Sequence, residues 1–132
     1  MNKTKVIEFL NKNDIADIEE IDYNGEGTVL RFYYDFDNEE IEAARAYAND
    51  ESEDEENGDV WYEEFFLPYL SDLAVDNVGE IIEEMMEELQ IGAQFVSYEM
   101  DEEEYGYNEF IGVFFEEGKT IEIEDVLDKL EM

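Results

Sequence analysis

The sequence predicts a single α+β domain over residues 1–132, with helices covering one face of an antiparallel sheet of about four strands. Three observations predict this fold class. Segments with apolar residues at helical spacing alternate with segments in which every second residue is apolar. The length of 132 residues suits one domain. Hydrophobic residues make up 44% of the chain, enough for a core despite a formal net charge of −34.

The chain is expected to begin with a helix and a β-hairpin. Residues 3–12 place apolar side chains on one side of a helix, and residues 18–23 form a weakly marked strand. The segment Asn24–Gly27 predicts a tight turn, because glycine readily adopts the positive φ that such turns need. Residues 28–36 alternate strictly between the two faces of a strand, which makes this the strongest strand prediction.

A second helix is predicted over residues 39–49, with Asp37 or Asn38 as its N-cap. Residues 50–59 are acidic at seven of ten positions, so we expect a solvated, flexible loop that separates the two halves of the domain. The buried stripe of the helix is predicted to comprise Ile41, Ala44, Tyr47 and Ala48.

Residues 60–70 are dense in aromatic side chains, and Trp61 is expected in the core. A helix interrupted at Pro68 is predicted here, because proline lacks the backbone N–H and its ring clashes with the preceding turn. A separate, long amphipathic helix is then predicted to open at Asp76 or Asn77. Its apolar stripe comprises Val78, Ile81, Ile82, Met85, Met86 and Leu89.

The C-terminal part of the chain predicts a second hairpin and a last helix. Residues 93–100 and 108–116 form the two strands, residues 101–107 the acidic loop between them, and residues 122–131 the helix. The order helix, hairpin, helix therefore occurs twice. We take this order as the basis for a hypothesis that the domain is a pseudo-repeat of two helix–hairpin–helix units.

The composition excludes several classes of enzyme. The chain contains no His and no Cys, so Cys–His and Ser–His–Asp catalysis and zinc sites with nitrogen or sulfur ligands are excluded. A carboxylate pair of the kind used by glycosidases stays open, but among 41 Asp and Glu residues such a pair is uninformative. We therefore expect a protein that is not an enzyme and that needs no cofactor.

Divalent metal binding has two candidate sites. One comprises Asp35, Asp37, Glu39 and Glu40 at a strand–helix junction, which helix capping explains as well. Asp22–Val29 imitates the first eight positions of an EF-hand loop, but Tyr33 stands where the loop needs a bidentate glutamate, and a strand follows where a helix should. A hairpin turn explains the segment better, so no metal site is predicted. The acidic loops are expected to attract divalent cations only weakly.

The N-terminus carries no apolar run of the kind found in signal peptides, and no segment is apolar for long enough to span a membrane. We therefore expect a cytoplasmic protein without a membrane partner. The oligomeric state stays open.

Acidic side chains are the candidate functional groups. No Lys or Arg occurs between Ala46 and Gly118. Like charges at helical i, i+3 and i, i+4 spacing each cost some tenths of a kcal/mol, so their retention favours a use in binding over a merely solvated helix face. Two tyrosines in the second acidic loop are of a type that anchors interfaces. The predicted partner-binding residues are Glu80, Glu83, Glu84, Glu87, Glu88, Asp101, Glu102, Glu103, Glu104, Tyr105 and Tyr107.

The net charge of −34 indicates the class of partner. It repels nucleic acid and attracts basic proteins. Spaced carboxylates on a rigid scaffold can imitate a phosphate backbone. The prediction is therefore a nucleic-acid mimic that inhibits a nucleic-acid-handling protein by occluding its basic site. The alternative is an acidic domain that has no nucleic-acid-linked partner and that itself binds cations weakly.

Overall fold

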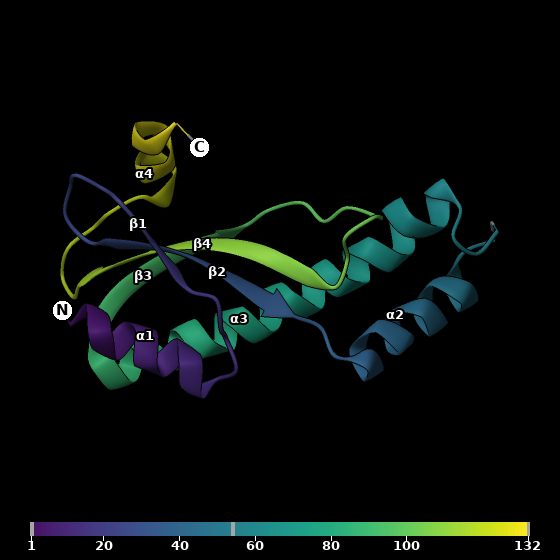
Figure 1. Cartoon of the computed structure of the whole chain (residues 1–132), viewed down its shortest axis with the longest axis horizontal. Coiled ribbons are helices and arrows are strands. Elements are labelled where there is room, and N and C mark those ends of the chain that lie inside the picture. Colours follow the sequence, from purple (N-terminus) through teal and green to yellow (C-terminus); the bar gives the residue numbers. More distant parts are fainter. Residues whose placement is uncertain (1, 54, 132) are drawn as a thin grey trace.

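A four-stranded antiparallel sheet lies against a long helix in the computed structural model, which describes residues 2–53 and 55–131 (Figure 1). The strand order is β1-β2-β4-β3, and the α+β class is confirmed. The elements in chain order are α1 (Lys3–Lys12), β1 (Glu19–Ile21), β2 (Thr28–Asp35), α2 (Asn38–Glu51), the π-helical segment η1 (Trp61–Phe66), α3 (Leu67–Leu89), β3 (Ile91–Ser97), β4 (Tyr107–Glu116) and α4 (Ile123–Leu130).

Alternate residues of the central strands bury two cores on opposite faces of the sheet. Leu30 and Phe32 belong to the larger core, which α1, α2 and α3 complete. Val29 and Val113 belong to the smaller core on the other face, which α4 covers with Ile123 and other apolar residues. Helix α4 thus departs from the expected one-sided arrangement, because the apolar residues of the second face must also be removed from water.

The long helix begins earlier than predicted and is not broken at Pro68. Helical structure runs without a gap from residue 59 to residue 89, so the predicted opening at Asp76 or Asn77 was wrong. The preceding turn widens into η1, where the N–H of Leu67 donates to the carbonyl of Tyr62, five residues earlier. This wider turn accommodates the ring of Pro68, which would clash with a regular α-helical turn.

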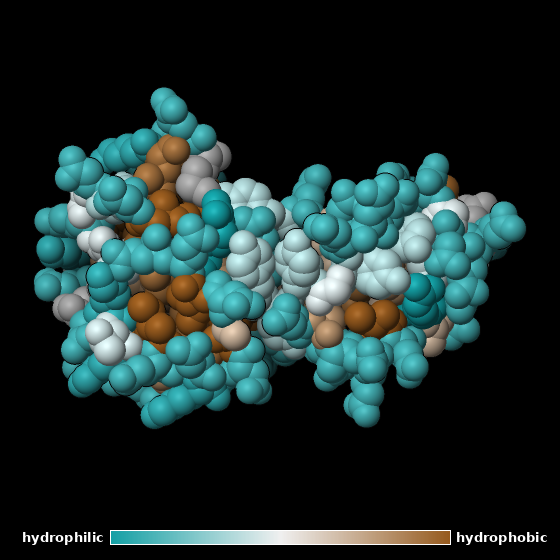
Figure 2. Space-filling model, in the orientation of Figure 1, coloured by the Kyte–Doolittle hydropathy of each residue, from teal (hydrophilic) through white to brown (hydrophobic). Residues whose placement is uncertain are grey.

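Two lobes lie side by side along the long axis of the molecule, joined by the long helix (Figure 1). The sheet lobe contains the sheet, α1, α4 and the C-terminal half of α3. The helical lobe contains α2, η1, the N-terminal half of α3 and the β3–β4 loop (residues 98–106), which reaches back over that part of the helix. Figure 2 shows a constriction between the lobes and hydrophilic residues over most of the visible face.

Two local predictions are confirmed and one is wrong. Asp37 caps α2 in a reciprocal capping box with Glu40, as its place before the helix indicated. Trp61 is fully buried, as expected. Tyr47 was predicted to be buried but is 42% exposed, because α2 buries only a narrow stripe centred on Ala44 and Ala48.

The connections between elements are shorter than some of those predicted. Helix α2 extends to Glu51 and helical structure resumes at Asp59, which shortens the predicted 50–59 loop from both sides. Asp54, which belongs to that prediction, lies outside the described residues. Residues 22–27 join antiparallel β1 and β2, which confirms the hairpin interpretation. The pseudo-repeat stays a prediction.

Candidate acidic interface

The helix over residues 59–89 carries a high density of exposed carboxylates. At a rise of 1.5 Å per residue it is about 46 Å long, so its ten carboxylates give roughly one per 5 Å, against one phosphate per about 3.4 Å along one DNA strand. No Lys or Arg occurs on this helix. The exposed carboxylates are Asp59, Glu63, Glu64, Asp72, Asp76, Glu80, Glu83, Glu84, Glu87 and Glu88.

Five of these residues recur at four-residue intervals on α3, and we call them the acidic row. Side chains four residues apart lie about 6 Å apart along a helix axis and about 40° apart around it, so the row winds by about 160° around α3 from its first member to its last. The buried residues Ala74, Val78 and Ile82 follow the same interval on the opposite side, so packing against the sheet holds the row toward solvent. The acidic row consists of Asp72, Asp76, Glu80, Glu84 and Glu88.

The structure does not gather the predicted binding residues into one cluster. Glu80, Glu84 and Glu88 belong to the acidic row, whereas Glu83 and Glu87 line a shallow cleft beside the end of α3. All five are exposed. The row thus spans two lobes, with Asp72 and Asp76 at its helical-lobe end.

The acidic residues of the β3–β4 loop lie beside the start of α3, well away from Glu80–Glu88. Asp101 and Glu102 line a cleft together with Leu67 and Asp72. Glu103 and Glu104 are exposed in the same turn, where the N–H of Glu103 donates to Asp101 Oδ1 at 2.7 Å. The loop therefore meets the acidic row at Asp72, its first member.

Sequence reasoning missed Asp72 and Asp76. The signal was present, because carboxylates recur every fourth residue from position 72 to position 88. It was overlooked because the helix was expected to start at Asp76 or Asn77, which left no helical face on which Asp72 could join the glutamates.

The two predicted interface tyrosines have different environments. Tyr107 is 38% exposed, and its ring lies edge-on to that of Tyr33 at 5.4 Å. Its hydroxyl donates to Glu104 Oε2 at 3.0 Å, which raises the pKa of Tyr107. Tyr105 is half-buried, and its ring packs edge-on against Phe66 at 4.9 Å. Tyr107 is thus available to a partner, whereas Tyr105 holds the loop on the helix.

Arg45 organises the helical lobe from within. Its Nη2 donates to the hydroxyl of Tyr105 at 2.9 Å and its Nη1 to Asn57 Oδ1 at 3.1 Å. Its guanidinium carbon lies 5.3–5.9 Å from the ring centres of Trp61, Phe66 and Tyr105, within cation–π range. These contacts join α2, η1 and the β3–β4 loop. The guanidinium of Arg45 therefore already has its binding partners within the protein.

The positive side chains are distributed unequally between the lobes. Among the described residues, Arg45 is the only Lys or Arg side chain of the helical lobe, and Glu56 lies 3.7 Å from its Nη1. In the sheet lobe, Lys3, Arg31 and Lys119 pair with carboxylates, and Lys3 lies 2.7 Å from Glu20. The helical lobe is therefore the more strongly negative end. The sheet-lobe cations are Lys3, Lys5, Lys12, Arg31, Lys119 and Lys129.

Tyr34 of β2 ties the sheet to both α2 and α3. Its hydroxyl donates to Glu40 Oε2 of α2 and accepts from Asn77 Nδ2 of α3, both at 2.7 Å. Burial, followed by the hydrogen bond to Glu40, raises the pKa of Tyr34 to about 12. This hydrogen-bonded bridge fixes α2 and the acidic row relative to the sheet.

The raised pKa of Tyr34 predicts a late step in an alkaline titration. One of the nine tyrosines should ionise near pH 12, and this step should be absent from Tyr34→Phe when the ultraviolet absorbance of tyrosinate is followed. Because the folded-state pKa exceeds the ordinary value of 10.0, the stability that Tyr34 contributes is present below pH 10 and falls between pH 10 and about 12. Identical titration curves for the two proteins would contradict this assignment.

Two further observations bear on function. Within residues 2–53 and 55–131, no group of three acidic side chains is arranged to hold a metal ion, and no helix has the length and apolar character needed to cross a membrane. Comparisons with models of protein families, with curated proteins and with solved structures found no match. The acidic surface is therefore the feature from which a function can be inferred.

Proposed function

We propose that this protein is a non-enzymatic binding protein that occludes the basic groove of a nucleic-acid-handling protein. The observation that carries the proposal is the acidic row, a regular series of exposed carboxylates that winds slowly around one helix without Lys or Arg. The row spans about 24 Å, a length that about seven phosphates occupy along one DNA strand.

The rigidity of the helix supports this function. Leu70, Ala74, Val78 and Met85 on its other side are fully buried, so the helix backbone that carries the carboxylates is fixed before any partner arrives. Preorganised charges cost less ordering entropy on binding than charges on a mobile segment do. They also steer a basic partner during diffusional encounter and accelerate association at low salt.

The test begins with affinity capture from lysate at low salt, followed by release in a salt gradient. A captured protein supports the proposal only if it binds labelled duplex DNA or RNA and the wild-type chain displaces that duplex, as measured by fluorescence anisotropy. We expect at least about tenfold weaker displacement by a row variant, because five interfacial charges are lost. This variant combines Asp72→Asn, Asp76→Asn, Glu80→Gln, Glu84→Gln and Glu88→Gln.

A matched variant removes the same number of negative charges from exposed positions outside the long helix. It should displace the nucleic acid within about twofold of wild type. Equal losses in both variants would show that only total charge matters and would contradict the role of the row. A captured protein that binds no nucleic acid would favour the alternative of an acidic domain with another kind of partner. The matched changes are Glu8→Gln, Asp22→Asn, Glu117→Gln, Asp128→Asn and Glu131→Gln.

A further inference from the structure

A groove of about 340 Å³ between α2 and α3 exposes aromatic rings on the helical lobe. Tyr47 from α2 and Tyr69 from α3 lie with their ring centres 5.2 Å apart and their planes inclined by 33°. Phe65 and Pro68 contribute further apolar surface. Tyr47 is among only three large hydrophobic side chains that are exposed in the described part of the chain. We call this feature the tyrosine groove.

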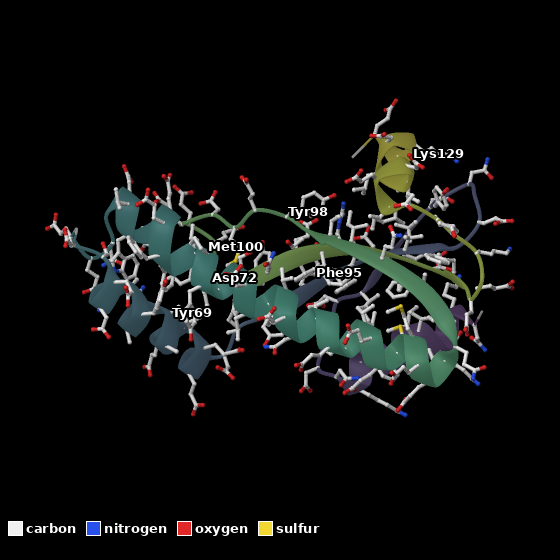
Figure 3. All side chains as sticks on the ribbon, turned by 180° about the vertical axis from the view of Figure 1, so that it is seen from behind. Tyr69, Asp72, Phe95, Tyr98, Met100 and Lys129 are labelled. Atoms are coloured by element: carbon white, nitrogen blue, oxygen red, sulfur yellow. The ribbon has the colours of Figure 1, made fainter. Side chains whose placement is uncertain are left out.

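Carboxylates line the tyrosine groove together with its rings. Glu64, Asp72 and Asp76 are all exposed and line it, and two of them belong to the acidic row. Seen from behind in Figure 3, Tyr69 lies on the α2 side of α3, Met100 lies on the opposite side, and Asp72 lies between them. The groove thus opens onto the part of the surface where the row begins.

Rings and carboxylates together are suited to a guanidinium group. A planar guanidinium stacks on a tyrosine face and donates paired hydrogen bonds to a carboxylate, whereas a lysine ammonium is a compact, strongly hydrated charge without a planar face. Within the protein, Arg45 already lies over the rings of Trp61 and Phe66 in the same lobe. Carboxylates alone would offer the paired hydrogen bonds but no ring on which the guanidinium could stack.

We propose that the tyrosine groove binds an arginine side chain of the basic partner and gives the acidic surface a preference for arginine over lysine. This inference rests on the proposed function and adds selectivity to it. Charge complementarity identifies the occupant, because the groove has three carboxylates and no Lys or Arg among its lining residues. A second copy of the chain is a poor occupant, since two chains that each carry a net charge of −34 repel each other.

The test compares two amidated peptides of equal charge, hexa-arginine and hexa-lysine, by isothermal titration calorimetry at low salt. We expect wild type to bind hexa-arginine at least about threefold more tightly than hexa-lysine, the range that one exposed cation–π contact supplies. Tyr47→Leu, which keeps apolar area but loses the ring, should remove this preference. Tyr47→Phe, which keeps the ring, should retain it.

Tyr23→Leu is the control, because Tyr23 lies in the β1–β2 connection of the sheet lobe, outside the groove and outside the predicted binding residues. This variant should keep the preference. Equal binding of both peptides by wild type, or a preference that survives Tyr47→Leu, would overturn the arginine site. Either result would leave the proposed function intact, because displacement of nucleic acid by the acidic row is measured separately. Circular dichroism checks that each variant is folded.

Discussion

Replacing Trp61 with alanine is expected to lower the free energy of unfolding by about 3–5 kcal/mol, the usual cost of deleting a large buried aromatic side chain. Trp61 is fully buried and stacks on Phe66 with ring centres 4.8 Å apart. Its Nε1 donates to Asn49 Oδ1 at 2.9 Å, and the guanidinium of Arg45 lies 5.5 Å from its ring centre. The substitution therefore removes the centre of the helical lobe, and the rest of the lobe cannot fill the space.

Urea unfolding followed by far-ultraviolet circular dichroism measures this loss without relying on tryptophan fluorescence. Trp61→Phe is the control, because it keeps an aromatic ring against Phe66 and loses mainly the hydrogen bond to Asn49. Trp61→Phe should lower the free energy of unfolding by about half as much as Trp61→Ala, or less. A loss below about 1 kcal/mol for Trp61→Ala would mean that the helical lobe does not depend on this core.

The row variant defined above is expected to be more stable than wild type by about 1–2 kcal/mol. Successive members of the acidic row form four like-charged i, i+4 pairs, and each pair costs some tenths of a kcal/mol. Glu88 adds an unfavourable interaction with the negative end of the helix dipole, because it lies in the last turn of α3. Neutral amides of similar shape remove both effects while they leave the apolar face of the helix unchanged.

Urea unfolding at low and high salt tests this prediction. The stability difference should shrink at high salt, because added ions screen interactions between exposed charges. The matched variant, whose substitutions lie outside the long helix, should gain less at low salt. If the row variant is no more stable than wild type, the charges of the acidic row do not lower the free energy of unfolding, and the prediction is wrong. Greater stability combined with weaker displacement of nucleic acid would show that the carboxylates lower stability in return for binding.

Much of the fold could be predicted from the sequence, because local patterns determine the elements concerned. Large apolar residues stand at every second position from Leu30 to Phe36, and the C-terminal half of α3 repeats its apolar residues at helical spacing. Asp37 and Glu40 show the spacing of a capping box. The large negative charge, the lack of His and Cys and the absence of Lys and Arg over a long central segment are properties of composition alone. They determine which kinds of catalysis are excluded, and they indicate that a partner with positive charge is attracted.

Only the tertiary structure decided how these elements meet. Arg45 and Tyr105 are sixty residues apart in the chain, and no local spacing indicates that the arginine lies among the rings of the helical lobe. The continuation of the helix through Pro68 depends on a π turn, stabilised by buried neighbours on both sides of the proline. Tyr47 is exposed because of how α2 packs on α3. Such contacts arise when distant segments share a core, so local patterns cannot specify them.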